Sequence, residues 1–340
     1  MSFTEYLNKA VRYLRPFHWM NVEVTSRCNL QCTMCPRRSF EASNQDMSRE
    51  LFLKLSDDFK LFRMIDLTGW GEPLLHPDFF EFVRIAKSKR CRVKYVSNGV
   101  AFNKDKADET IKTGVDWIVF SVDSPENKTY REIRGADLEK VSANIRYLSE
   151  IKKKKGLKYT LIDIAIVISK KNIEELPDMV RFAKDLGANR FLVNNLHVIT
   201  KKEDIDALLY RIDPAQTIDE HQRDHMVDDA LKIASELNIP MSLCFNSFEP
   251  KPLSTCTLNL NKTMFISARG DVSPCCDLGH PVPGYLDRNN VIKNTELVFG
   301  NIKNNSIMEI FNSKPYTEFR GRILSGIPDE CRHCMLIRGI

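Results

Sequence analysis

Ten cysteines stand in this chain of 340 residues, and eight of them fall into two groups. The first group has the spacing C-x3-C-x2-C within the stretch SRCNLQCTMCPRR, which places thiols at Cys28, Cys32 and Cys35. A structural zinc site needs four protein ligands, and neither a histidine nor a fourth cysteine follows within local reach. Soft thiolates favour iron–sulfur clusters, and a cubane held by three cysteines leaves one iron open to another molecule. We therefore expect a reactive cluster; a zinc site with a distant fourth ligand, or buried thiols, is the alternative.

The second group lies near the C-terminus and consists of Cys256, Cys275, Cys276, Cys331 and Cys334. Gly270 stands five places before Cys275, and the last two cysteines form a C-x2-C pair. Four such thiolates could bind an iron–sulfur cluster or a structural zinc ion, and spacing alone leaves both open. Cys276 could replace Cys275 as a ligand. The two remaining cysteines, Cys91 and Cys244, stand alone in apolar surroundings and are expected in the core.

Short apolar runs alternate with amphipathic stretches from the first cysteine group to about residue 200, which is typical of parallel strands joined by helices. The expected strands are 21–26, 64–69, 92–99, 117–123, 161–169 and 190–198. In the stretch 173–186 the apolar residues fall on one helical face, and Gly187 supplies the stop. Six successive βα units predict an α/β fold, a partial (β/α)6 TIM-like barrel. Ligands of such folds sit at the carboxyl ends of the strands.

Composition divides the chain into four parts. We expect a helical extension over residues 1–20, the barrel over 21–200, a helical connector over 201–240 and a small cysteine-rich lobe over 241–340. Lys and Arg exceed Asp and Glu by only five, 50 against 45, so the charge does not indicate a nucleic-acid partner. No stretch approaches the roughly 20 apolar residues of a membrane helix, and no signal peptide is visible, which favours a cytoplasmic location without membrane association.

The first cysteine group resembles the motif of the radical S-adenosylmethionine (SAM) enzymes, which carry C-x3-C-x2-C on the loop after the first barrel strand. The resemblance implies a [4Fe–4S] cluster on Cys28, Cys32 and Cys35, with SAM chelated to its fourth iron. Later segments are also similar to the family pattern, and the resemblance assigns them SAM contacts: Gly71, Glu72 and Pro73 in GWGEP, Ser97 and Asn98 in YVSNG, Ser121 and Asp123 in FSVDS, and Arg134 in REIRG. Met34 stands where relatives commonly carry an aromatic residue near the adenine.

The C-terminal cysteines resemble the SPASM and Twitch extensions of the same enzymes. This resemblance implies a second, auxiliary [4Fe–4S] cluster on Cys256, Cys275, Cys331 and Cys334, with structural zinc as the rival. Four protein ligands would leave no iron open, which favours electron transfer over coordination of a substrate.

The implied reaction is reductive cleavage of SAM to a 5′-deoxyadenosyl radical, which abstracts hydrogen from a substrate C–H bond. A reducing partner such as flavodoxin or ferredoxin would supply the electron. Only 27 residues precede Cys28, whereas peptide-modifying relatives often carry a leader-binding domain there. We therefore expect an oxidoreductase that carries out a two-electron, dehydrogenase-like oxidation of a small polar metabolite, with the auxiliary cluster as electron acceptor. The alternatives are a maturase acting on a peptide or protein, and a non-catalytic zinc scaffold.

Candidate bases facing the barrel mouth are Asp66, His76, Asn194, Asn195 and His197. None has a specific pattern around it, so no catalytic base is assigned.

Overall fold

The computed structural model describes residues 14–340, except 40–43, 252, 255 and 293–295. Most of the expected N-terminal extension falls on residues 1–13, outside the described residues. Its last four positions, 17–20, belong to strand β1 (Phe17–Val22), so the sheet begins earlier than predicted. The strand also ends earlier than predicted, because residues 23–26 form the start of the loop that carries the first cysteines.

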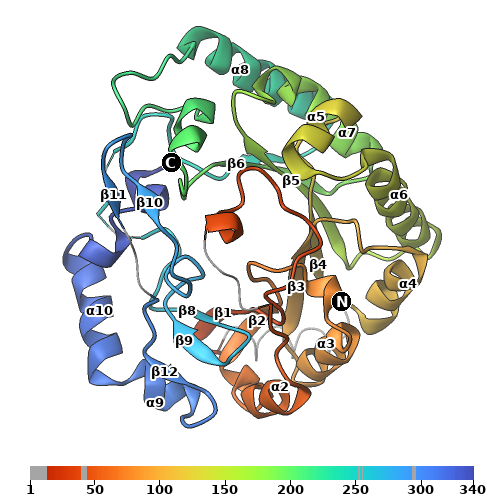
Figure 1. Cartoon of the computed structure of the whole chain (residues 1–340). Coiled ribbons are helices and arrows are strands. Elements are labelled where there is room, and N and C mark those ends of the chain that lie inside the picture. Colours follow the sequence, from red (N-terminus) through yellow and green to blue (C-terminus); the bar gives the residue numbers. More distant parts are fainter. Residues whose placement is uncertain (1–13, 40–43, 252, 255, 293–295) are drawn as a thin grey trace.

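Among the described residues, ten strands form one sheet in the order β12-β9-β8-β1-β2-β3-β4-β5-β6-β7. Its central run comprises the six strands expected from the sequence: β1, β2 (Phe62–Asp66), β3 (Arg92–Ser97), β4 (Trp117–Ser121), β5 (Leu161–Ile168) and β6 (Arg190–Asn195). Each of the six pairs in parallel with the next. The sheet curves around a central space with helices outside it, which confirms the partial barrel (Figure 1).

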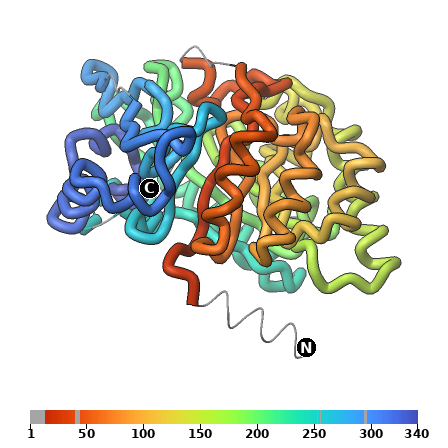
Figure 2. The backbone as a smooth tube through the Cα atoms, turned by 90° about the horizontal axis from the view of Figure 1, so that it is seen from below, coloured from red at the N-terminus to blue at the C-terminus, as the bar shows by residue number. Residues whose placement is uncertain are grey.

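The C-terminal part of the chain extends this sheet at both edges. β7 (Met241–Leu243) pairs with β6, and β8 (Thr263–Ile266) pairs in parallel with β1. Two further strands, β9 (Asp271–Ser273) and β12 (Gly300–Asn301), continue the sheet in antiparallel fashion. The expected lobe therefore shares a sheet with the barrel and lies directly beside β1 (Figure 2).

The rest of the lobe consists of short elements: the hairpin β10 (Gly284–Tyr285) and β11 (Val291–Ile292), the helices α9 (Ile307–Phe311) and α10 (Lys314–Ser325), and the 3-10 turns η6 (Asp329–Cys331) and η7 (Met335–Arg338). A capping box starts α9, because Ser306 and Glu309 each accept a hydrogen bond from the other's backbone N–H.

The outer layer of the barrel consists of α2 (Arg49–Ser56), α3 (Phe79–Ser88), α4 (Lys104–Thr113), α5 (Asn127–Arg134), α6 (Leu138–Lys154) and α7 (Leu176–Asp185). Short 3-10 turns, η1 (Pro36–Ser39), η2 (Phe59–Leu61), η3 (Pro73–Leu75) and η4 (Ile173–Glu175), lie in the connections. The helix predicted over 173–186 forms as η4 and α7, and Gly187 follows it with φ of 77°.

Strand residues alternate between the helix-facing core and the barrel interior. Val93 and Tyr95 of β3 are fully buried beneath the helices, whereas Lys94 between them lines an internal cavity. The same alternation places Trp19 and Asn21 of β1 inside the barrel. The parallel strands thus form an apolar outer core and a polar, partly hollow interior.

The expected connector contains the 3-10 turn η5 (Lys202–Ala207) and α8 (Glu220–Glu236), which packs against α7. Asp219 caps α8 by accepting a hydrogen bond from the Gln222 N–H. No helix in the described ranges is long and apolar enough to cross a membrane. Cys91 is buried in the core as predicted, but Cys244, which directly follows the edge strand β7, is exposed, so its predicted core position was wrong.

Candidate functional site

The first cysteine group lies on the loop after β1, at the carboxyl ends of the strands. Cys28, Cys32 and Cys35 line one cleft, which we call the mouth cleft. The Cys35 N–H donates to the Cys32 carbonyl at 3.1 Å, so the C-x2-C segment forms a tight turn. Burial raises the pKa of Cys28 and of Cys35, and the neighbouring thiols add to the effect. One buried and two half-buried thiols on one short loop fit a positively charged iron centre that stabilises their thiolate forms.

The segment after β2 packs directly against this loop. A Cβ atom on Gly71 would lie 2.1 Å from the Thr25 carbonyl oxygen, so only glycine fits there. The Glu72 N–H donates to the Arg27 carbonyl at 2.8 Å. The position of Gly71 in the family pattern therefore has a steric cause in this chain.

Glu72 lines the mouth cleft, but its carboxylate is engaged with donors of its own chain. It accepts hydrogen bonds from the Ser97 hydroxyl at 2.9 Å and from the Asn98 N–H at 2.7 Å. Burial raises the pKa of Glu72. The carboxylate joins the loops after β2 and β3. Pro73 is buried at the start of η3 and does not line the cleft, so it shapes the loop.

The loops after β3 and β4 bring further predicted residues to the cleft. Ser97, Asn98 and Ser121 all line it. The Asn98 side-chain amide donates to Asn29 at 2.9 Å and lies 3.8 Å from the Cys28 sulfur. Asn98 is thus held beside the first cysteine group.

Asp123 and Arg134 form a buried ion pair at the back of this group. Asp123 is fully buried, and its carboxylate accepts from the Arg134 guanidinium and from the Val167 N–H at 2.8 Å. Arg134 lines the cleft and donates to the Cys32 sulfur at 3.8 Å. Asp123, predicted as a SAM contact, is not among the lining residues and orients Arg134.

The candidate bases separate into different environments. Buried His76 is held by the Met47 carbonyl at 2.9 Å and the Asp78 N–H at 3.0 Å, away from the cleft. Asp66 lies in a second cavity inside the barrel. Asn194, Asn195 and His197 line the mouth cleft.

Asn195 carries the clearest sign of a missing ligand. Its side-chain nitrogen is buried and has no hydrogen-bond partner within the described part of the chain. A buried amide donor without a partner is costly, so this atom fits a group that binds in the cleft.

The second cysteine group divides between two cavities. Cys256, Cys275, Cys331 and Cys334 line one small cavity in the C-terminal lobe. Burial raises the pKa of each of these thiols, that of Cys331 to about 12. Cys276 does not line that cavity and instead lines the mouth cleft. Within the described residues no three His, Cys, Asp or Glu side chains are grouped as ligands of a single metal ion.

Sequence reasoning missed several residues of the mouth cleft, among them Trp70, Cys276 and Asp277. Trp70 donates through its indole N–H to the Cys276 carbonyl at 3.0 Å, and Asp277 lies 3.5 Å from His197 Nε2. All of Trp70, Cys276 and Asp277 line the cleft. For Cys276 and Asp277 the sequence offered a signal, the run Cys-Cys-Asp in the cysteine-rich lobe. Nothing in the sequence indicated that Trp70 contacts the lobe.

Together, these features define an iron–sulfur enzyme built on a partial α/β barrel, with three thiols at the strand ends and four more in an attached lobe. The chain matches the radical SAM superfamily over residues 22–183 and an iron–sulfur cluster-binding domain, SPASM, over residues 256–335. It belongs to the radical SAM superfamily and carries a C-terminal SPASM domain. Its cofactors are therefore a [4Fe–4S] cluster with SAM, and auxiliary iron–sulfur chemistry in the lobe.

Two curated relatives are similar over most of the chain. The tungsten-containing aldehyde ferredoxin oxidoreductase cofactor-modifying protein of Pyrococcus furiosus is 30% identical over 326 residues, 94% of this chain and 87% of that protein. The antilisterial bacteriocin subtilosin biosynthesis protein AlbA of Bacillus subtilis is 26% identical over 311 residues, 88% of this chain and 60% of that protein.

Among solved structures, Streptococcus suis SuiB bound to the precursor peptide SuiA superposes with a TM-score of 0.63 at 14% identity, covering 98% of this chain and 73% of SuiB. At this identity the similarity shows the fold. It agrees with the barrel and lobe described above.

Proposed function

We propose that this radical SAM enzyme modifies a peptide or a partner protein, including a group that such a protein carries. The observation that carries the proposal is the 30% identity, over nearly the full length of both chains, to a protein named for modifying the cofactor of another enzyme. The bacteriocin biosynthesis protein AlbA points the same way. The small-metabolite oxidation expected from the sequence has no comparable support.

In this proposal Cys28, Cys32 and Cys35 hold the SAM-cleaving cluster. When bound, the cluster and SAM supply a 5′-deoxyadenosyl radical that abstracts a hydrogen atom from a substrate C–H bond. Arg134, oriented by Asp123, provides a fixed positive charge for a carboxylate at the cleft.

Two further groups orient the molecules bound in the cleft. The unpartnered Asn195 amide provides a hydrogen-bond donor. The Trp70 indole, held by its hydrogen bond to the Cys276 carbonyl, forms part of the cleft wall. Both are fixed before the substrate arrives, which lowers the entropy cost of positioning it.

The lobe residues Cys256, Cys275, Cys331 and Cys334 are assigned the auxiliary cluster. Their common cavity supports this assignment, and Cys276 is not among its lining residues. A cluster with four protein ligands has no free coordination site for substrate.

The first test counts iron and sulfide per chain after anaerobic reconstitution, together with 5′-deoxyadenosine formation. The parent should contain about eight irons, four for each of two clusters. A C28A/C32A/C35A variant should contain about four and form no 5′-deoxyadenosine. A variant that still cleaves SAM would overturn the assignment of the first group.

The second test addresses the substrate class. An extract of the native cells is divided by dialysis, and each fraction is added to the reconstituted enzyme with SAM and reductant. We expect the retained, macromolecular fraction to stimulate 5′-deoxyadenosine formation, and protease treatment to abolish the effect. Stimulation by the dialysable fraction alone would support the small-metabolite reaction instead.

A further inference from the structure

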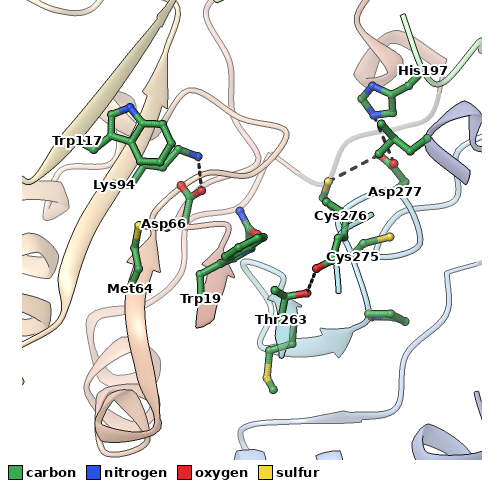
Figure 3. A pocket seen from close by; sticks show the side chains of 15 residues that line it. Trp19, Met64, Asp66, Lys94, Trp117, His197, Thr263, Cys275, Cys276 and Asp277 are labelled. Atoms are coloured by element: carbon green, nitrogen blue, oxygen red, sulfur yellow. Dashed lines mark hydrogen bonds and ion pairs between the residues drawn. The ribbon is translucent and has the colours of Figure 1, made fainter. Parts of the chain in front are cut away.

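A second cavity lies inside the barrel, next to the mouth cleft (Figure 3). We call it the lumen cavity. Its walls include the inward-facing side chains Trp19, Met64, Asp66, Lys94, Trp117 and Thr263, from β1, β2, β3, β4 and β8. In closed barrels the interior is filled by layers of branched aliphatic side chains. Here aromatic and charged side chains take those positions and leave a hollow.

The lumen cavity adjoins the mouth cleft. Asn21, His197, Cys276 and Asp277 line both. A group bound in the lumen therefore lies beside the residues that line the mouth cleft.

One wall of the lumen cavity carries a buried ion pair. Lys94 Nζ lies 2.5 Å from an Asp66 carboxylate oxygen, and the two side chains are 17% and 5% exposed. Removing each charge from water costs several kcal/mol, so a buried pair of this kind is a poor source of stability. The Lys94–Asp66 pair lies where aliphatic side chains would pack well, which indicates that it serves to recognise a bound group.

Trp117 fixes the position of the ammonium group. Lys94 Nζ lies 5.0 Å from the centroid of the Trp117 ring. The Arg190 guanidinium also lies over this ring, at 4.7 Å, and pairs with Asp163 at 2.7 Å. Each cation around the indole is thus matched by its own carboxylate, and the wall carries no net charge.

The ion pair retains hydrogen-bonding capacity toward the cavity. An ammonium group has three donors, and Lys94 uses one of them on Asp66. A carboxylate has about four acceptor positions, and Asp66 uses two, for Lys94 and the Thr68 hydroxyl. A donor and an acceptor therefore lie side by side. A bound anion would be repelled by Asp66, and a bound cation would be repelled by Lys94.

We propose that the lumen cavity is a subsite for a carboxamide group of the substrate, with the Lys94 ammonium donating to its oxygen and the Asp66 carboxylate accepting from its nitrogen. The indole rings of Trp19 and Trp117 and the Met64 side chain contact the apolar framework that carries the amide. The subsite deepens the proposed function and rests on it, because it serves the same substrate. A peptide supplies such a group as an Asn or Gln side chain or a backbone amide, and a smaller molecule supplies it as an amide or lactam.

The test uses three planar probes of the same shape and different charge: benzamide, benzoate and benzamidinium. Binding to the reconstituted enzyme is measured by ligand-observed NMR, with and without saturating SAM. We expect benzamide to bind about tenfold more tightly than either ion, the difference of roughly one well-placed hydrogen bond. Binding should persist with SAM present, since the lumen cavity and the mouth cleft are different pockets.

Substitutions in the ion pair should change the preferred probe. In Asp66→Asn the Lys94 charge becomes unpaired, and benzoate should become the preferred probe. In Lys94→Met the Asp66 charge becomes unpaired, and benzamidinium should be preferred. Lys87→Met is the matched control, because it removes a Lys–Asp pair of the same 2.5 Å length outside the lumen. It should leave the order of the probes unchanged.

Probe binding to the parent enzyme alone can overturn the proposal, even where a variant fails to fold. The proposal is wrong when an ion binds the parent as tightly as benzamide, when no probe binds, or when SAM displaces benzamide. The proposed function fails separately, through the iron counts and SAM cleavage, which require no ligand in the lumen.

Competition then distinguishes the two sources of the amide. Benzamide that suppresses stimulation by the macromolecular fraction indicates a peptide amide. Suppression of stimulation by the dialysable fraction indicates an amide or lactam of a small molecule.

Discussion

Two adjacent cysteines in the lobe face different cavities, and this difference can be tested residue by residue. Both line the lumen cavity, but Cys275 also lines the small cavity of the quartet, whereas Cys276 also lines the mouth cleft. We expect Cys275→Ser to lower the iron content from about eight to about four per chain, and Cys276→Ser to leave it unchanged. Iron and sulfide analysis after reconstitution measures both. The opposite pattern would make Cys276 the fourth ligand.

The Asp123–Arg134 pair provides a second test at the same scale. Asparagine keeps the shape of Asp123 and removes the charge that orients Arg134 toward the cleft. We expect Asp123→Asn to weaken SAM binding about tenfold, the loss of one charge-assisted hydrogen bond, with the iron content retained. Equilibrium dialysis with labelled SAM measures the effect.

The control for this variant is Asp185→Asn, which breaks the exposed Arg146–Asp185 pair. Exposed pairs contribute little, so this control should bind SAM like the parent. Equal SAM affinity in the two variants would show that Asp123 has no part in SAM binding.

At the scale of elements, the loop after β2 connects the barrel to the lobe through Trp70. Its backbone N–H donates to Glu23 at 2.9 Å, and its indole N–H donates to the Cys276 carbonyl at 3.0 Å. The same Glu23 carboxylate lies 3.1 Å from His280 Nε2. Trp70 thus links the segment after β1 to the turn that carries Cys275 and Cys276.

We expect Trp70→Phe to weaken SAM binding several-fold and to change the electron paramagnetic resonance spectrum of the auxiliary cluster, because the phenyl ring cannot donate to Cys276. The iron content should stay at the parental value. Trp70→Ala, which also removes the ring from the cleft wall, should have the larger effect on SAM. A Trp70→Phe enzyme with unchanged affinity and spectrum would show that the loop and the lobe act independently.

The local pattern predicted the six central strands, because β-branched alternation and turn residues are visible within a single segment. The strand over 161–169 was predicted almost residue for residue, as β5. The pairing of β8 with β1 was not predicted. It joins residues more than 240 positions apart, and a strand of four residues does not specify its partner.

The site was likewise predictable only where residues close in sequence are also close in space. Cys28, Cys32 and Cys35 are close in sequence and close in space, so their spacing was enough to place them in one cleft. The divergent positions of Cys275 and Cys276 depend on how one turn packs between two cavities. The position of Asp66 inside the barrel follows from the alternation of side chains along β2. Its ion pair with Lys94 depends on the pairing of β2 with β3.

At the scale of the whole molecule, the lobe is part of the barrel's structure. β8 lies beside β1 in the sheet, and Phe17 of β1 packs against both Phe62 and Phe311, with ring centroids 4.8 Å apart in each pair. The auxiliary site and the first strand of the barrel therefore share one packed region. Loss of order in the lobe should extend to β1.

Removal of the auxiliary cluster tests this dependence. Without iron, burial keeps the pKa of these thiols raised and favours their protonated forms, and the cluster bonds between Cys256 and the C-x2-C pair 75 residues later are lost. Closing a loop of that length costs entropy, which the cluster bonds offset. We expect chelation to reduce hydrogen-exchange protection in β8, β9 and α10, and then in β1, while β4 and β5 stay protected.

The C28A/C32A/C35A variant, which lacks only the SAM-cleaving cluster, should keep the protection of β8 and β9. Equal loss in that variant would mean that the first cluster stabilises the lobe, and uniform loss in β4 and β5 would mean that the chain unfolds as one unit.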